Sequence, residues 1–369
     1  MFDFSEGAYN QLLINPRLSD EEKNIFLELH EAFADQFGVK NYFLVPSSGS
    51  SKKMNESVKL IALHRDAVLN SAKRFNDYFR ASAEHHWGLV LPSFHVAGLG
   101  TYARAYLAGS QVFENTWSDS QIKFLSIVPA QLYDFVNQNQ NAPKNLQTVL
   151  VGAGVLNAEI KGKAVSLGWP LVETYGMSET ASMIAVKEKN ILHTLPNVEV
   201  QTENQQLKIK CNSLLTCYLQ KKDSQIFITQ PVQGGWYQTE DQAAVNGDQI
   251  NLLGRSSDYI KILGEGVSLA ELKDRLAALS IKHQISHGAV ALLDMEDPRS
   301  GHQLILAVEN SVNSEIIKRL LAEFNQSSRP YEKIKKTIRL EKIPLSDLGK
   351  IRTQELKEIV LKKLKAESS

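Results

Sequence analysis

Two segments of this sequence carry side chains suited to a ligand that bears phosphate groups. Residues 45–53, VPSSGSSKK, follow a strand-like run and supply small residues whose backbone amides and hydroxyl groups could wrap phosphates. Glu179, within the run VETYGMSET at residues 172–180, offers a carboxylate, a hard oxygen ligand suited to a metal ion that also binds phosphates. The alternatives are a Ser-rich loop without a ligand and a turn with a helix cap.

A third polar segment, residues 234–272, joins an acidic loop, a hairpin, a Gly-Arg turn and a capped helix. Asn246-Gly247, a pair that tolerates positive φ, lies between two strand-like runs and predicts the hairpin. Ser268, followed three residues later by Glu271, predicts a helix that begins with a capping box. The alternative interpretation is a surface hairpin and a solvated charged helix, with no ligand.

In their order and content, these segments resemble the adenylate-forming superfamily of acyl-CoA synthetases. In that superfamily GWYxTxD and GRxxDxIKxxGExVxxxEL segments close a large domain and open a small one; here GWYQTED begins at residue 235 and GRSSDYIKILGEGVSLAEL at residue 254. The resemblance implies an α/β large domain at residues 1–256, with a β-rich subdomain at about 196–254, and a small mobile α+β domain at 257–369. It also implies ATP, Mg²⁺ and CoA as cofactor and co-substrates.

The resemblance assigns a role to each residue around the nucleotide. Tyr175 packs on the adenine ring, Ser178 contacts the α-phosphate, and Glu179 holds Mg²⁺. Asp241 accepts hydrogen bonds from the ribose hydroxyls, and Arg255 contacts the ribose or a phosphate. The other nucleotide-binding residues that the resemblance implies are Ser47, Ser48, Gly49, Ser50, Ser51 and Lys52 in the phosphate loop, Gly152, Ala153 and Gly154 on the adenine side, and Gly176 and Met177 beside Tyr175.

Two further motifs complete the resemblance. PLSDLGKIR, at residues 344–352, matches a PxTxxGKxxR loop and makes Lys350 the adenylation lysine, a mobile point charge that reaches carboxylate and phosphate oxygens. LPSFHVAGL, at residues 91–99, resembles an LPxFHxxGL segment at the acyl pocket and places His95 and Gly98 there. Taken alone, Lys350 would be a solvated turn residue and His95 a hydrogen-bonded core residue.

Within the superfamily, the sequence looks most similar to the o-succinylbenzoate-CoA ligases of menaquinone biosynthesis. FLVPSSGSSK, SIVPAQL, VLVGAG and TYGMSETAS carry this resemblance, and Ser257 lies at the hinge, where these ligases commonly have GRxSD. We therefore expect an enzyme that adenylates a carboxylic acid, o-succinylbenzoate, and transfers the acyl group to CoA. The alternatives are another acyl-CoA or aryl-CoA ligase and a non-catalytic descendant that binds a nucleotide or an acyl group.

The sequence departs from the superfamily pattern at three places. After the phosphate loop the superfamily usually continues with a Gly and a Pro-Lys-Gly, whereas here the run is Lys52-Lys53-Met54. The sequence therefore does not decide which lysine reaches the β- and γ-phosphates. Glu240 replaces the usual glycine; we expect it to face solvent, since a carboxylate turned inward would repel phosphate. Only 46 residues precede Ser47, so most of an N-terminal subdomain of the relatives is missing.

Local patterns predict the elements that position these residues. Ser19 with Glu22 predicts a capped helix that ends at Gly38. Alternation of apolar runs with helical segments then predicts an α/β sheet with ligands at the strand ends. The predicted strands of the large domain are 42–45, 58–63, 88–91, 124–128, 148–151 and 171–174, and the predicted elements of the small domain are helix 269–279, strands 289–293 and 303–308, helix 312–326, strand 334–340 and a C-terminal helix.

Composition excludes several other classes of protein. Lys plus Arg equals Asp plus Glu at 41 each, so the overall charge does not indicate a nucleic-acid partner. No stretch approaches the ~20 apolar residues of a membrane span, and the first residues lack a signal-peptide pattern. Cys211 and Cys217 are expected to be core thiols. We therefore expect a cytoplasmic protein, and a homodimer is left open.

Overall fold

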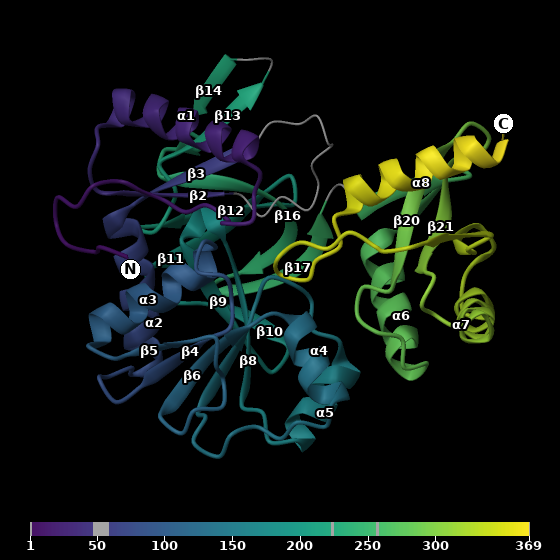
Figure 1. Cartoon of the computed structure of the whole chain (residues 1–369), viewed down its shortest axis with the longest axis horizontal. Helices are drawn as coiled ribbons and strands as arrows, with labels where there is room; N and C mark the ends of the chain where they lie inside the picture. Colours follow the sequence, from purple (N-terminus) through teal and green to yellow (C-terminus); the bar gives the residue numbers. More distant parts are fainter. Residues whose placement is uncertain (1, 47–58, 223–224, 256–257, 369) are drawn as a thin grey trace.

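The computed structural model describes residues 2–46, 59–222, 225–255 and 258–368 (Figure 1). Within these ranges the strands form three sheets, of five, twelve and five strands. The two sheets built from residues before 256 lie together, and the third lies beyond β16 and β17 with its own helices (Figure 1). Across the described part of the chain, no helix has the length and apolar character that a membrane crossing requires.

The twelve-stranded sheet has a parallel part, as the alternation of strands and helices predicts. Its parallel strands lie in the order β8-β7-β6-β4-β5. The predicted strand at 148–151 is confirmed, whereas the strand predicted at 88–91 begins and ends two residues earlier. The five strands are β4 (His86–Leu89), β5 (Val112–Glu114), β6 (Ile122–Ile127), β7 (Thr148–Val151) and β8 (Leu171–Met177).

Helices cover both faces of this parallel part (Figure 1). Neighbouring residues on a strand point to opposite faces, so Phe124 and Leu125 of β6 enter two separate apolar cores. Parallel strands are typically buried on both sides, and the packing here follows that rule. The helices on the Phe124 face are α2 (Arg65–Phe79) and α3 (Val96–Ala108), and those on the Leu125 face are α4 (Pro129–Asn137) and α5 (Ala158–Ser166).

Antiparallel strands extend the same sheet beyond β8. The predicted hairpin is confirmed, and its central turn residues are Gly247 and Asp248, of which Gly247 alone has a positive φ, 60°. A glycine at the first central position is typical of a type II′ turn, so Asn246 remains in the strand. These strands are β9 (Ser182–Glu188), β10 (Ile191–Thr194), β11 (Val198–Glu203), β12 (Gln206–Cys211), β15 (Val232–Gln233), β16 (Trp236–Asn246) and β17 (Gln249–Arg255).

The N-terminal five-stranded sheet combines segments that are distant in the sequence. The predicted β-rich segment does not stay together, because Cys217–Gln220 pair with Lys59–Ala62 and carry the following hairpin into this sheet. Helix α1 (Asp20–Phe37) packs on it through an apolar core that includes buried Cys217, and its predicted capping box is confirmed. The strands are β1 (Gln11–Leu12), β2 (Tyr42–Pro46), β3 (Lys59–His64), β13 (Cys217–Lys222) and β14 (Gln225–Thr229).

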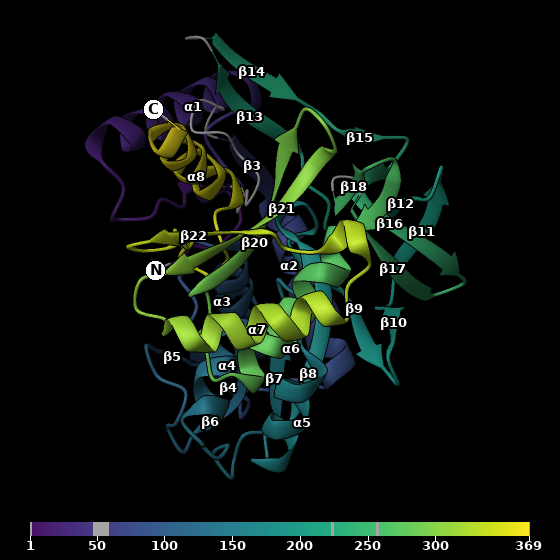
Figure 2. The same ribbon diagram turned by 90° about the vertical axis from the view of Figure 1, so that its right-hand side faces the viewer.

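The third sheet belongs to residues 258–368 and also separates two apolar cores. Helices α6 and α7 pack on one face, and α8 packs on the other (Figure 2). Its first hairpin was not predicted; the turn consists of Leu263 and Gly264, both with positive φ. The elements are β18 (Tyr259–Ile262), β19 (Glu265–Ser268), α6 (Leu269–Lys282), β20 (Val290–Asp297), β21 (Gly301–Glu309), α7 (Ser314–Gln326), β22 (Lys336–Leu340) and α8 (Thr353–Ser368).

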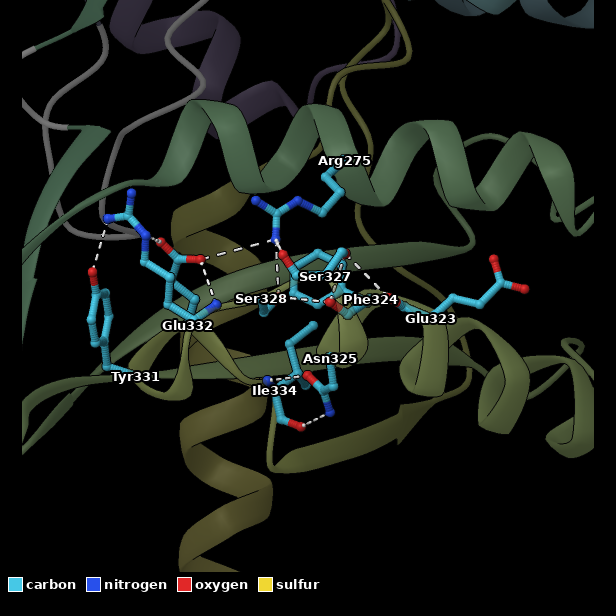
Figure 3. Close-up of polar contacts among 10 residues, drawn as sticks. Arg275, Glu323, Phe324, Asn325, Ser327, Ser328, Tyr331, Glu332 and Ile334 are labelled. Carbon is cyan, nitrogen blue, oxygen red and sulfur yellow. Dashed lines mark hydrogen bonds and ion pairs between the residues drawn. The ribbon is translucent and has the colours of Figure 1, made fainter.

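Polar contacts join α6 to the C-terminal end of α7 (Figure 3). Arg275 of α6 donates to the Ser327 carbonyl at 3.1 Å and to the Ser328 hydroxyl at 3.0 Å. A cation at a helix C-terminus satisfies carbonyl groups that have no partner within the helix. Asn325 exchanges two hydrogen bonds with the backbone of Ile334, so the chain after the helix is also fixed.

Candidate nucleotide and acyl site

A cavity of about 310 Å³ opens at the carboxyl ends of the parallel strands. The segments that follow β4, β6, β7 and β8 each contribute to its wall, and ligands of open α/β sheets bind at this edge. The wall includes the predicted site residues His95, Gly152, Ala153, Gly176, Met177, Ser178, Glu179, Asp241, Arg255 and Lys350. Ser47, Ser48, Gly49, Ser50, Ser51, Lys52 and Ser257 lie outside the described residues.

Two predicted glycines serve chain packing. Gly98, predicted in the substrate pocket, is not among the residues that line the cavity; an added Cβ would lie 2.5 Å from the Pro92 carbonyl oxygen, so this glycine lets α3 begin against residues 92 and 93. Gly154 also lies outside the lining. Gly176 lines the cavity, and its close approach to β9 leaves no room for a side chain, because a Cβ would lie 2.2 Å from the Ser182 carbonyl oxygen.

Asp241 and Arg255 form a cross-strand pair at the open end of the β16-β17 hairpin. Arg255 Nε donates to Asp241 Oδ1 at 2.9 Å. Burial alone would lower the pKa of Arg255, but the Asp241 carboxylate raises it above its usual value. Tyr175 donates from its hydroxyl to Asp241 Oδ2 at 2.6 Å and lies outside the cavity lining, so its stacking on adenine stays a prediction.

Glu179 lies in a short 3₁₀ turn directly after β8, and two tyrosines of other strands position it. Tyr218 of β13 donates to Glu179 Oε1 at 3.0 Å and lies 2.7 Å, hydroxyl to hydroxyl, from Tyr237 of β16. Burial and the Glu179 charge raise the pKa of Tyr218, so its hydroxyl stays protonated. Tyr218 was not predicted as a site residue from the sequence, because only the long-range pairing of β13 with β3 brings it here.

Glu179 could hold Mg²⁺ together with phosphate oxygens. Mg²⁺ is commonly bound by one or two carboxylates plus substrate phosphates and waters. Among the described residues, no group of three or more His, Cys, Asp or Glu side chains is placed to hold a metal ion by itself. The residues present therefore fit an ion that depends on the nucleotide for most of its ligands.

The Lys350 loop enters the cavity from the third sheet. Lys350 lines the same wall as Arg255, and its pKa is lowered by burial and by the Arg255 charge. The loop is closed by a backbone hydrogen bond from Ser346 to the Lys350 carbonyl at 2.7 Å. Leu348 packs in an apolar cluster with Leu89 of β4 and with Leu91 and Val128, which follow β4 and β6.

Asp347 anchors the Lys350 loop to the N-terminal segment. Asn15 Nδ2 donates to Asp347 Oδ2 at 2.7 Å, and Arg17 Nη2 donates to Asp347 Oδ1 at 2.6 Å. His287 Nε2 donates to the Gly349 carbonyl at 3.0 Å, which fixes the loop from the other side. Contacts from both parts of the chain therefore hold Lys350 inside the cavity.

Helix α3 forms the other wall with His95 and Arg104. His95 precedes the helix, and its Nε2 is buried without a hydrogen-bond partner among the described residues. Arg104 is only 3% exposed, donates to the Ser182 hydroxyl at 3.0 Å and lies 4.6 Å from the Phe75 ring centroid. Burial lowers the pKa of Arg104 to about 10, so the side chain stays charged near neutral pH.

Arg104 has no carboxylate at ion-pair distance within the described ranges, although it lines the cavity. Arg104 was not predicted as a site residue from the sequence. The available signal was a single charge within the otherwise uncharged helix VAGLGTYARAYLA. An arginine in an apolar helix marks a buried charge that needs a partner.

Comparisons with known proteins agree with this geometry. The sequence model of the AMP-binding enzyme family matches residues 58–215. The 2-succinylbenzoate-CoA ligase of Escherichia coli strain K12 is 27% identical over 66% of this chain and 54% of its own length. The ligase of the same name from Lactococcus lactis is 25% identical over 79% of this chain and 66% of its own length. The chain thus spans about half to two thirds of these relatives.

Solved structures confirm the adenylate-forming fold. The o-succinylbenzoate CoA synthetase MenE from Bacillus subtilis, in complex with the acyl-adenylate intermediate OSB-AMP, superposes with a TM-score of 0.74 at 19% identity, over 94% of this chain and 83% of that one. A variant of E. coli MenE with bound OSB-AMS gives a TM-score of 0.66 at 24% identity, over 87% and 69%.

Proposed function

We propose that this chain is an acid-CoA ligase that forms AMP, and the match of residues 58–215 to the AMP-binding enzyme family supports this proposal. It activates a carboxylic acid with ATP and then transfers the acyl group to CoA. The observation that carries this proposal is the convergence of Glu179, Asp241, Arg255 and Lys350 on one cavity. Lys350 comes from the loop between β22 and α8, 95 residues after Arg255 in the sequence.

The proposed first step needs positive charge and no side-chain nucleophile. A carboxylate oxygen attacks the α-phosphorus of ATP, and the bond to the leaving pyrophosphate breaks. Both reactants are anionic, so Lys350 and Arg255 stabilise the charge that concentrates between them. Asp241 accepts hydrogen bonds from the ribose, which fixes the nucleotide. Mg²⁺ bound beside Glu179 would neutralise phosphate charge.

The buried charge of Arg104 favours a substrate acid that carries a second carboxylate, and o-succinylbenzoate is such an acid. A buried guanidinium without an anionic partner is costly, and a carboxylate bound in the cavity would offset that cost. The names of both curated relatives point to the same substrate. With that substrate, the proposal extends to menaquinone biosynthesis and to the cytoplasmic location that the sequence predicts.

The second step requires a different arrangement of the two predicted domains, 1–256 and 257–369. CoA attacks the acyl carbonyl carbon through its thiol, and AMP leaves. Lys350 fills part of the cavity wall, so the small domain must turn about Ser257 before the thiol enters. The β18-β19 hairpin, with Gly264, Glu265 and Gly266, then faces the site.

Pyrophosphate release with a panel of acids tests the proposal. We expect release with o-succinylbenzoate and much slower release with benzoate or fatty acids. Release with another acid alone would favour a different acyl-CoA or aryl-CoA ligase. Release with none of them, although ATP binds, would favour a non-catalytic nucleotide-binding protein.

A further inference from the structure

Tyr133 of α4 makes a hydrogen bond to the part of the chain that carries the third sheet. Its hydroxyl donates to the carbonyl of Ile285, which follows α6, and the two residues are buried, at 7% and 3% exposed. Burial raises the pKa of Tyr133, so the hydroxyl keeps the proton that it donates. Because the two residues are 152 positions apart, this bond ties residues 258–368 to the sheet that α4 covers.

A short path of contacts leads from Ile285 to the Lys350 loop. His287 lies two residues after Ile285, and its Nε2 donates to the Gly349 carbonyl at 3.0 Å. Gly349 also approaches α4 itself, because an added Cβ would lie 3.0 Å from the Cβ of Ala130. Helix α4 therefore positions the loop at two points, directly and through the turn that contains His287.

An apolar contact accompanies the hydrogen bond of Tyr133. Ile281, near the end of α6, is 6% exposed and packs in one core with Leu132 of α4 and Ile160 of α5. The other buried members of that core, among the described residues, all lie before residue 170. The third sheet and its helices thus dock on α4 and α5 through one buried isoleucine and one buried hydrogen bond at this place.

A cavity of about 270 Å³ lies beside this contact and is lined by both parts of the chain. Pro129 and Leu156 line it from one part, and Leu276 and Val290 line it from the other. Side chains that face a cavity lose some of the dispersion attraction that close packing gives. The docking contact therefore depends on few groups, and the loss of one of them should change how often the two parts are docked.

We propose that Tyr133 is a positioning residue for acid activation, which keeps Lys350 in the cavity by docking residues 258–368 on α4. This inference rests on the proposed function, in which Lys350 serves the first step and leaves the cavity before the second. The hydrogen bond exists only while the two parts are docked. It therefore stabilises the arrangement for adenylation over the arrangement for acyl transfer, and it must break in each domain rotation.

The two half-reactions of Tyr133→Phe test this inference. Phe keeps the ring and its packing and removes only the hydroxyl. The quantity to measure is the rate of adenylation divided by the rate of acyl transfer from supplied adenylate and CoA. Loss of one hydrogen bond should lower this ratio roughly three- to tenfold. Adenylation slows if the docked arrangement is the minor one, and acyl transfer quickens if it is the major one, so the ratio falls in either case.

Tyr78→Phe is the matched control, because the Tyr78 hydroxyl donates to Glu188 and both residues precede residue 256. This variant should leave the ratio unchanged. Thermal unfolding shows that each variant is folded before rates are measured. A merely structural role of Tyr133 would slow both half-reactions alike, so an unchanged ratio in folded Tyr133→Phe would overturn the inference.

Hydrogen exchange tests the docking without catalysis. The backbone amides of Gly349 and Arg352 each donate within the Lys350 loop at 2.9 Å. In Tyr133→Phe these amides should exchange roughly three- to tenfold faster, because the loop is undocked more often, whereas Tyr78→Phe should match wild type. Unchanged exchange in Tyr133→Phe would also overturn the inference. Wild-type protein that releases no pyrophosphate with any acid would instead overturn the proposed function and leave the docking contact to the exchange data.

Discussion

Replacing Arg104 with Met tests the proposed recognition of a second carboxylate. The side chain is 3% exposed, and its hydrogen bond is to the neutral Ser182 hydroxyl at 3.0 Å. Met has a similar stem and can keep the contacts with Phe75 and Trp87 while it removes the charge. The substitution therefore separates the charge of Arg104 from its packing.

The structure sets opposite expectations for stability and for activity. Loss of the Ser182 hydrogen bond lowers the free energy of unfolding by about 1 kcal/mol. Removal of a buried charge that has no partner raises it by at least a similar amount, because the desolvation penalty of that charge disappears. We expect the free energy of unfolding of the ligand-free protein to stay within about 1 kcal/mol of wild type, or to rise. Truncating one partner of a buried charged contact costs about 2–5 kcal/mol, so kcat/KM for o-succinylbenzoate should fall roughly 30- to 5,000-fold.

Pyrophosphate release with two acids is the assay. The comparison acid is 4-oxo-4-phenylbutyrate, which lacks the second carboxylate of o-succinylbenzoate. Wild-type protein should prefer o-succinylbenzoate, and Arg104→Met should lose most of this preference because activity on the comparison acid has no ion pair to lose. Equal losses with the two acids would refute the reasoning.

Arg74→Met is the matched control for Arg104→Met. Arg74 is also buried, at 5% exposed, but it donates to the Pro196 carbonyl, the Ser213 hydroxyl and the Asn212 side chain. Its loss leaves those groups without a donor, so this variant should be destabilised by about 2–4 kcal/mol without a change in acid preference. If Arg104→Met lowers the free energy of unfolding as much as Arg74→Met does, the conclusion that Arg104 has no anionic partner in the ligand-free protein is contradicted.

Three further predictions concern groups around the cavity. Burial lowers the pKa of His95 below its usual value, so the unfolded chain binds more protons and the free energy of unfolding falls as pH drops below about 6.5 toward the folded-state pKa. Denaturant unfolding of His95→Gln should therefore show a smaller loss of unfolding free energy between about pH 7 and 5 than wild type. A loss equal to that of wild type would contradict this. Asp347→Ala removes the contacts with Asn15 and Arg17 and should weaken docking of the Lys350 loop by about 1 kcal/mol. Adenylation should then slow roughly fivefold, while acyl transfer from a preformed adenylate should keep its rate. Equal slowing of both half-reactions would contradict the role of Asp347 in anchoring this loop. Glu179→Gln should raise the Mg²⁺ concentration for half-maximal pyrophosphate release roughly tenfold or more, and an unchanged requirement would exclude Glu179 as a ligand.

Local sequence patterns predicted most of the secondary structure. The capping box at Ser19, the hairpin around Gly247 and the strand at 148–151 depend on residues close in the chain, and all three are confirmed. The β18-β19 turn was missed, because Leu263 is an unusual residue at positive φ and hides a turn that Gly264 alone only suggests. The resemblance also led correctly to the adenylate-forming fold.

The site was only partly accessible from the sequence, because several of its residues act through long-range pairing. Tyr218 reaches Glu179 only after β13 joins β3, and Lys59 faces the cavity only when that pairing exists. Arg104 lies on a helix whose other residues are uncharged, and its position beside the cavity depends on the packing of α3 on β4 and β9. Gly98 was placed in the pocket by its motif, whereas its contact with Pro92 gives it a packing role.

The central claim is that Lys350 serves acid activation in the arrangement observed. It is tested most directly by measuring both half-reactions of Lys350→Ala. The account predicts that pyrophosphate release from ATP and o-succinylbenzoate falls by at least about 100-fold, while conversion of supplied o-succinylbenzoyl-adenylate and CoA to the thioester continues at close to the wild-type rate. Pyrophosphate release at the wild-type rate, or an equal loss of both half-reactions, would contradict it.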